Sequence, residues 1–397
     1  MWLMQAIICL GALALLLWLV FLLALAAFSQ AGGPGTPHPA AFKRLVVLIP
    51  AHNEEGLVGR TVTSVRRADY PSERLRVLVV ADNCNDQTAA EAKAADAECL
   101  VRTDERQRGK GYALRFGLAA ILEDPREFDG VVFLDADSSV APDFLKRLSD
   151  HLAAHHAIIQ GCYTVAEPQR SWLTRLTHLG FVLKNHFQYP GLNRLGLSVP
   201  LRGSGMCFSR EVLEAQGWGS VSLTEDLDFS VTLIRRGYRI LFEPKAVNWQ
   251  YMPPNLTAAR VQRARWSQGE TEAAKHQLRA FCRASLQKHD WPGAIQAAYL
   301  MAPPFSSLFL SALALSGAAQ ALALLGPASF AWLPGLCLIV SGLYAAYFLL
   351  ALTVTGFSWG YLAALLMVPV YALWRTGIHL YSRRPGTAQT WTRTPRK

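Results

Sequence analysis

Charge is scarce in this sequence, and two long stretches contain none. Asp, Glu, Lys and Arg together make up 17% of the 397 residues, whereas hydrophobic residues make up 51%. Residues 2–28 and 291–374 contain no charged side chain of these four types. About 20 consecutive apolar residues suffice for a helix to cross a bilayer, so this distribution argues against a wholly soluble chain and predicts membrane helices near both ends.

The signatures of several common protein classes are also absent. The seven cysteines show no CxxC spacing, which argues against a zinc site or a disulfide framework. No GxGxxG follows the first apolar strand, so a dinucleotide-binding dehydrogenase loses its main support. No basic run is interleaved with aromatics, so the formal net charge of +10 predicts anionic lipid and a diphosphate substrate as partners, and no nucleic acid.

Most of the charge lies between the two apolar regions, and this pattern divides the chain into six parts. Pro303-Pro304 is expected to break the first of three C-terminal apolar segments, because proline removes a backbone donor. The parts are an N-terminal transmembrane helix (1–29), a Gly/Pro-rich linker (30–41), a catalytic domain (42–255), interfacial helices (256–290), C-terminal transmembrane or interfacial helices (291–381) and a basic tail (382–397).

The basic residues also predict an orientation. Lys43, Arg44 and the other basic residues of the middle block favour a cytosolic catalytic domain in a multi-pass protein of the cytoplasmic (inner) membrane. The basic tail favours the cytosol too, whereas three full spans would place it on the opposite side. This conflict favours one C-terminal segment lying in the membrane interface.

Three apolar runs in the middle block predict buried, parallel strands. They cover residues 45–50, 75–82 and 130–137, and helix-like stretches separate them. We therefore expect an α/β fold with a mostly parallel, doubly wound sheet. Such sheets bind ligands beyond the carboxyl ends of their strands, where Asp82, Asp135 and Asp137 fall.

Three short motifs carry candidate chemistry, each with a structural alternative. In LDADS, Asp135 and Asp137 could hold Mg²⁺ or Mn²⁺ against a diphosphate, or form a solvated turn. In SLTEDLDFS, a carboxylate at a helix N-terminus could act as a base, or the acidic residues could simply cap a helix behind Thr224. In QRARW (residues 262–266), two guanidinium groups and an indole suit a phosphate and a sugar ring, but equally a membrane anchor.

Taken together, these motifs resemble the membrane branch of the family 2 glycosyltransferases, which contains the cellulose, chitin, hyaluronan and poly-N-acetylglucosamine synthases. The likeness covers nearly the whole chain, in the order VVLIPAHNEE, VVADNCNDQT, RGKGYAL, FLDADS, GSGMCFSR, TEDLDFS, QRARW and WTRTPR. It implies a GT-A-type, Rossmann-like domain flanked by transmembrane helices, and inverting transfer of a sugar from a UDP-sugar donor.

The resemblance also implies a role for each site residue. Asp226 would be the general base, with Glu225 beside it. Donor binding would fall to Pro50, Glu54, Asp82, Lys110, Asp135, Asp137, Gln262 and Arg265, with Mg²⁺ or Mn²⁺ on Asp135 and Asp137. Acceptor binding would fall to Arg202, Gly203, Ser204 and Trp266.

Two departures from the family pattern bear on the acceptor and the donor. Ala81-Asp82 stands where many members have two acidic residues, so only Asp82 is available there. LRGSG (residues 201–205) stands where cellulose synthases have a phenylalanine-cysteine-glycine sequence. Arg202 would then lie near the acceptor, which argues for a different or more anionic acceptor than cellulose.

These features support three functions. The first is extension of a polysaccharide from a UDP-sugar, and the second is a single transfer to a lipid or polyprenyl-linked acceptor. About four apolar segments offer little material to enclose a polymer, so polysaccharide export would need an accessory membrane subunit or a homo-oligomer. The third function, a non-catalytic nucleotide-binding scaffold of an export complex, gives no reason for convergent carboxylates.

Overall fold

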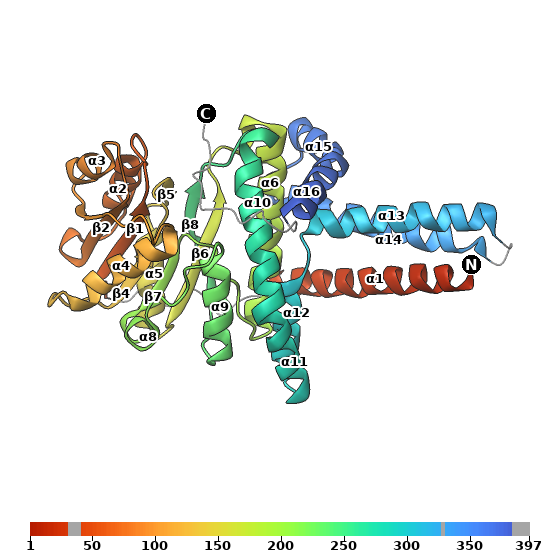
Figure 1. Cartoon of the computed structure of the whole chain (residues 1–397), viewed down its shortest axis with the longest axis horizontal. Helices are drawn as coiled ribbons and strands as arrows, with labels where there is room; N and C mark the ends of the chain where they lie inside the picture. Colours follow the sequence, from red (N-terminus) through yellow and green to blue (C-terminus); the bar gives the residue numbers. More distant parts are fainter. Residues whose placement is uncertain (31–40, 327–329, 383–397) are drawn as a thin grey trace.

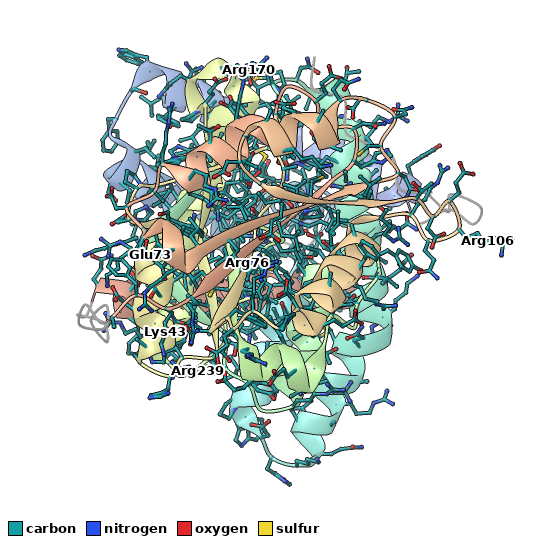
Figure 2. All side chains as sticks on the ribbon, turned by 90° about the vertical axis from the view of Figure 1, so that its left-hand side faces the viewer. Lys43, Glu73, Arg76, Arg106, Arg170 and Arg239 are labelled. Atoms are coloured by element: carbon teal, nitrogen blue, oxygen red, sulfur yellow. The ribbon has the colours of Figure 1, made fainter. Side chains whose placement is uncertain are left out.

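A mixed β-sheet and a set of long apolar helices occupy opposite ends of the protein (Figure 1). The computed structural model of the chain describes residues 1–30, 41–326 and 330–382. Most of the predicted linker (30–41) and nearly all of the basic tail (382–397), including WTRTPR, lie outside these residues. Figure 2 shows that charged side chains, among them those of Glu73, Arg76 and Arg106, are displayed on the end away from the apolar helices.

The described strands form one sheet in the order β3-β2-β1-β4-β7-β6-β8-β5. The pairs β1–β2, β1–β4, β2–β3 and β6–β8 are parallel, and the other three pairs are antiparallel. The strands are β1 (Leu45–Ala51), β2 (Leu75–Asp82), β3 (Glu98–Arg102), β4 (Gly130–Phe133), β5 (Ser138–Val140), β6 (Ile158–Val165), β7 (Met206–Ser209) and β8 (Leu241–Gln250).

Helices cover both faces of this sheet, because successive side chains of the inner strands point to opposite sides. Val46 and Leu48 of β1 enter one core, whereas Val47 and Ile49 enter the other. One core is completed by α2 (Val58–Arg66), α3 (Thr88–Ala94) and α5 (Phe144–Ala153), and the other by α4 (Lys110–Glu123), α8 (Arg210–Gln216) and α9 (Glu225–Arg235). Short 3-10 turns, η1 (Ser72–Arg74) and η2 (Pro168–Arg170), lie in connecting segments.

The predicted α/β class and the mostly parallel sheet are confirmed, and the three expected strands are neighbours. The third strand is shorter than its apolar run, because β4 ends at Phe133. The amide of Ser138 donates to the carbonyl of Asp135 (3.1 Å), which closes a turn into β5. Asp135 and Asp137 therefore belong to this turn and not to the strand.

Helices between the sheet and the membrane segments form the middle of the molecule (Figure 1). A first continuous run contains α6 (Trp172–Val182), the π-helix η3 (Leu183–Gln188) and α7 (Tyr189–Arg194). A second contains α10 (Leu256–Ala273), the π-helix η4 (Ala274–Leu278) and α11 (Arg279–Gln287), followed by α12 (Trp291–Met301).

Three described helices are long and apolar enough to cross a bilayer: α1 (Trp2–Gln30), α13 (Phe305–Leu325) and α14 (Leu333–Thr355). The number rises to four if α15 (Trp359–Leu366) and α16 (Val368–Ser382), which bend by 48° at their junction, make one span. The break expected at Pro303-Pro304 separates α12 from α13. These helices indicate a membrane protein.

The membrane helices share a core with the sheet domain. Leu19 and Leu25 of α1 are fully buried in the same cluster as residues of β1 and α4. Gly191 lets α7 approach α1 closely, because a Cβ at this position would lie 2.3 Å from the carbonyl oxygen of Leu25. The Gln188 amide also donates to the hydroxyl of Tyr347 in α14 (3.1 Å). The two parts are therefore packed as one unit.

Candidate active site

The carboxyl ends of the predicted strands open onto one cavity of about 1050 Å³. Because β1 lies between β2 and β4, Asp82 at the end of β2 and the turn after β4 face the same space. The predicted residues on its wall are Pro50, Glu54, Asp82, Lys110, Asp135, Asp137, Arg202, Gly203, Glu225, Asp226, Gln262, Arg265 and Trp266. Ser204 is the predicted residue that does not line it.

Lys110, the first residue of α4, connects the acidic groups of the cavity. Its Nζ donates to Asp135 Oδ1 (2.5 Å) and to the carbonyl of Gly203 (2.6 Å), and it lies 3.7 Å from Glu225 Oε1. Burial alone would lower the pKa of Lys110, but the neighbouring carboxylates outweigh it and hold that pKa above its ordinary value. Lys110 is therefore a fixed positive charge between two carboxylates.

Glu225 and Asp226 begin α9, where the free amides of a helix N-terminus favour negative charge. Burial raises the pKa of Glu225 to about 7, against the opposing charge of Lys110. Burial also raises the pKa of Asp226, although Lys110 and Arg202 oppose it. Thr224 stands at the N-cap position but its hydroxyl makes no capping hydrogen bond, so the structural alternative in which that side chain caps the helix is wrong.

Gly203 allows the loop before β7 to pass close to these groups. Its φ is +75°, a conformation that side chains rarely adopt, and a Cβ there would lie 3.2 Å from Lys110 Nζ and 3.4 Å from Asp226 Oδ2. The next residue, Ser204, is fully buried on the other side of the loop. Its hydroxyl accepts the amide of Asp135 and the side-chain amide of Gln250, both at 3.0 Å.

Ser204 was expected to contact the acceptor, but its side chain does not line the cavity. Because its hydroxyl instead accepts the Asp135 amide, we assign this side chain to positioning the Asp135 turn. Gln160 supports the same loop, donating to the Ser204 carbonyl (3.0 Å) and accepting the Arg202 amide (2.8 Å). Gln160 and Gln250 were not predicted, since buried polar residues of strands β6 and β8 have no distinguishing sequence pattern.

The helix α10 brings the QRARW residues to the opposite wall. Arg263 is buried, its guanidinium lies 4.7 Å from the centre of the Trp266 ring, and its Nη2 donates to Thr177 Oγ1 (3.3 Å). Arg263 Nε and Gln262 Oε1 are buried without a hydrogen-bond partner in the described part of the chain. Polar atoms buried in this way are rare, and a bound ligand would satisfy them.

Asp82 has a partner that the motifs did not reveal. Arg102, at the end of the neighbouring strand β3, donates to Asp82 Oδ1 (2.6 Å), and both side chains are buried. The same guanidinium donates to the carbonyl of Gln107 (2.8 Å), in the loop before Lys110. Arg102 thus fixes the Asp82 carboxylate, which was expected to bind the donor.

The donor set fits a hard divalent cation that is shared with a substrate. No three His, Cys, Asp or Glu side chains of residues 1–30, 41–326 and 330–382 lie close enough together to form a metal cluster alone. Asp135 and Asp137 offer two carboxylates on the cavity wall. Mg²⁺ typically binds one or two carboxylates together with substrate phosphates and water, so this pair is sufficient when a diphosphate completes the site.

Comparison with known proteins agrees with this geometry. The family described as "Glycosyltransferase like family 2" matches residues 43–269. A probable glucomannan 4-beta-mannosyltransferase of Arabidopsis thaliana is 25% identical over 256 residues, which are 61% of this chain and 47% of that protein. A beta-monoglucosyldiacylglycerol synthase of Synechocystis sp. is 27% identical over 245 residues, covering 59% and 49% respectively. The chain spans about half the length of the curated relatives it matches.

A solved structure extends the likeness to the membrane helices. A mannosyltransferase from Pyrobaculum calidifontis, in complex with GDP-Man and Mn²⁺, covers 96% of this chain and all of its own, with 19% identity and a TM-score of 0.62. At this identity the likeness shows the fold, which is GT-A-like with apolar helices at both ends. Since the matched segment exceeds half of the chain and includes the cavity-lining residues between Pro50 and Trp266, the chain belongs to the family 2 glycosyltransferases.

Proposed function

We propose that this enzyme transfers a sugar, with inversion at the anomeric carbon, from a nucleoside-diphosphate sugar to an acceptor embedded in the membrane. The observation that carries the proposal is the extent of the cavity. Its wall includes Asp82 and Asp135 at one end, and Trp18 of α1, Leu308 of α13 and Phe348 of α14 at the other. A donor in water and an acceptor in lipid can therefore reach the same carboxylates.

The strand ends provide the donor site. Pro50, Glu54 and Asp82 contact the nucleoside, and Lys110, Gln262 and Arg265 contact the diphosphate. Asp135 and Asp137 hold Mg²⁺ or Mn²⁺, which when bound neutralises negative charge on the leaving diphosphate. UDP is the nucleotide that the resemblance implies. The catalytic domain faces the cytosol, where Lys43 and Arg44 favour its retention.

Asp226 provides the base. An acceptor hydroxyl attacks the anomeric carbon while its proton passes to the Asp226 carboxylate, and the bond from that carbon to the diphosphate oxygen breaks. The electron pair leaves with the nucleoside diphosphate, whose charge Lys110 and Arg265 stabilise. Because attack and departure occur on opposite sides of the carbon, its configuration inverts. Glu225 holds Lys110 in place, and Trp266 offers its ring to the acceptor sugar.

The apolar end of the cavity favours a lipid acceptor over the polysaccharide extension that led the sequence interpretation. Leu22, Leu308 and Ala314 line this end, and an unpaired polar group of a polymer would lose several kcal/mol against such a surface. Polysaccharide extension remains the second candidate, because relatives named glucomannan mannosyltransferases match the same segment. A non-catalytic scaffold is not retained, since the chain belongs to an enzyme family.

Product analysis tests this function. The purified chain receives radiolabelled UDP- or GDP-sugars, Mg²⁺ or Mn²⁺, and lipids extracted from membranes. We expect label in the organic phase, and a loss of about 10²–10⁴-fold in rate for Asp226→Asn, because the base is removed. Asp228→Asn, in the same turn of α9 but not on the cavity wall, is the matched control and should keep the wild-type rate. High-molecular-mass product formed without lipid would reject the lipid acceptor, and transfer retained in Asp226→Asn would reject the base.

A further inference from the structure

Four cationic side chains gather on the cavity wall between the carboxylates and the membrane helices. They are Lys184 of η3, Arg202 before β7, Arg263 of α10 and Arg375 of α16. Burial, together with the positive charges of Arg202, Arg375 and Arg263, lowers the pKa of Lys184 to about 7, although Glu270 opposes this shift. The four groups therefore lie near enough to repel one another, although they come from four separate elements.

The carboxylates that face this cluster are fewer than its cations. Glu270 lies 3.7 Å from Arg375, and Asp226 faces Arg202, whereas Lys184, Arg202 and Arg263 form no ion pair within 4.0 Å in the described ranges. Arg263 is only 8% exposed and its Nε has no partner. Cations that outnumber their counter-ions in a partly buried site are costly, so the arrangement is that of a site completed by an anion.

The cluster lies where the sheet domain meets the membrane helices. Gln188, one turn after Lys184, accepts the hydroxyl of Tyr299 in α12 (3.0 Å) and donates to Tyr347 in α14. The same cavity continues from this junction to Trp18, Leu22, Leu308 and Ala314 of α1 and α13, two helices that run side by side (Figure 1). A ligand held by the cations can therefore extend an apolar chain between these helices.

We propose that the acceptor is a lipid-linked phosphate, in which a phosphate or diphosphate joins the sugar bearing the attacking hydroxyl to a long apolar chain. Lys184, Arg202, Arg263 and Arg375 bind the phosphate, and the apolar chain lies along α1 and α13. This inference rests on the proposed function, because it names the acceptor of the same reaction. Arg202 lies near Asp226 as well, so the hydroxyl is delivered to the base from the phosphate side.

The order of the polar groups along the cavity separates this anion from the donor. Lys110 and the Asp135 turn lie at the strand ends, where the donor diphosphate binds. Lys184 lies on η3, which packs against α1 and α14, and Arg263 lies on α10, which packs against the helix α16 that carries Arg375. Two phosphate groups, one from the donor and one from the acceptor, then flank the reacting carbon from opposite sides.

Equilibrium binding to the full chain in detergent tests the inference without any turnover. The probes are radiolabelled farnesyl phosphate, farnesol and inorganic phosphate, with no sugar donor present. We expect farnesyl phosphate to bind at least about tenfold more tightly than either of the others, because it alone has both the anion and the apolar chain. Lys184→Gln and Arg263→Gln should each weaken its binding by about tenfold.

Arg260→Gln is the matched control, since Arg260 is exposed on the same helix as Arg263 and does not line the cavity. Its affinity for farnesyl phosphate should equal that of the wild type. If Arg263→Gln does not elute as a monodisperse species, the affinity of Lys184→Gln for farnesyl phosphate alone tests the proposal. Excess UDP with Mg²⁺ should not displace farnesyl phosphate.

Any one of four results would overturn the lipid-phosphate acceptor. Farnesol or inorganic phosphate could bind as tightly as farnesyl phosphate, Lys184→Gln could keep the wild-type affinity for farnesyl phosphate, or UDP could displace farnesyl phosphate. Sugar transfer to a neutral lipid could still occur in those cases, so the proposed function would stand. Conversely, farnesyl phosphate binding without any sugar transfer would support the lipid-phosphate site and overturn the proposed function.

Discussion

Two adjacent carboxyl groups at the start of α9 share the positive charge of Lys110. A base must be ionised to accept a proton, and burial of Asp226 works against ionisation while Lys110 and Arg202 favour it. Burial, together with the charge of Asp226, raises the pKa of Glu225 to about 7. Glu225 therefore changes its ionisation within the physiological range.

This pairing predicts a pH dependence on the acid side. The raised pKa of Asp226 means that its protonated, inactive carboxyl persists to higher pH than in a free aspartate, so kcat/KM should fall by up to about tenfold per pH unit as the pH drops below that pKa. Above that pKa kcat/KM should be constant. Steady-state transfer rates at limiting donor, measured between about pH 5 and 8, give this profile.

Glu225→Gln is the companion variant. Because Glu225 is mostly protonated and uncharged below about pH 7, Glu225→Gln should leave the acid limb of Asp226 in place. A wild-type profile that is flat over the measured range, or an acid limb that Glu225→Gln shifts, would contradict this account of the pair.

At this scale the sequence located side chains that follow strands or begin helices, and missed those placed by tertiary packing. Asp82, Asp135 and Asp137 could be brought together in advance, because the carboxyl ends of adjacent parallel strands meet at one edge. Arg102 and Lys184 could not. Each of these two residues lies far in sequence from the side chains that it contacts in the site. A single basic residue in a strand or helix belongs to no motif whose spacing would identify it as a site residue.

Two π-helices occur in the elements that line the cavity. The wide turns of η3 and η4 interrupt the long helical runs 172–194 and 256–287, and they place Lys184 and Lys275 on the cavity wall. Single π-turns inside α-helices are rare and are often found at functional sites. Hydrophobic periodicity predicts a helix in both regions but does not show where the turn widens, so these side chains could not be oriented from the sequence.

The contact between α1 and α7 gives a test at the same scale. Gly191→Ala should lower the free energy of unfolding by about 1–3 kcal/mol, because its Cβ would collide with the backbone of Leu25. Gly180→Ala in α6 is the control, since a Cβ there meets nothing within 4 Å, and it should be neutral or stabilising by up to about 1 kcal/mol. Thermal unfolding in detergent, followed by tryptophan fluorescence, compares the two. Equal midpoints would show that α1 is not packed this closely against α7.

Across the whole molecule, the sheet domain and the membrane helices share one cavity and one core. The hydroxyl of Tyr344 in α14 donates to the carbonyl of Leu15 in α1 (3.0 Å), and the fully buried residues around it continue into the sheet domain. Composition predicted the apolar helices at both ends, because charge-free runs of this length have no other stable environment. It could not predict that the cavity enters them, since that depends on which faces of α1 and α13 meet.

The membrane end of the cavity can be closed selectively. Ala314 of α13 lines this end, whereas the adjacent Leu313 does not line the cavity. Ala314→Trp should lower kcat/KM for a lipid acceptor by about tenfold, because the indole fills the space of the apolar chain, and should leave the affinity for UDP unchanged. Leu313→Trp, which adds the same side chain facing away, should retain the wild-type values. Transfer assays with extracted lipid and UDP binding measured by calorimetry supply both readouts. Equal loss of transfer in the two variants would point to general perturbation of α13, and no loss in either would mean that the acceptor reaches Asp226 by another route.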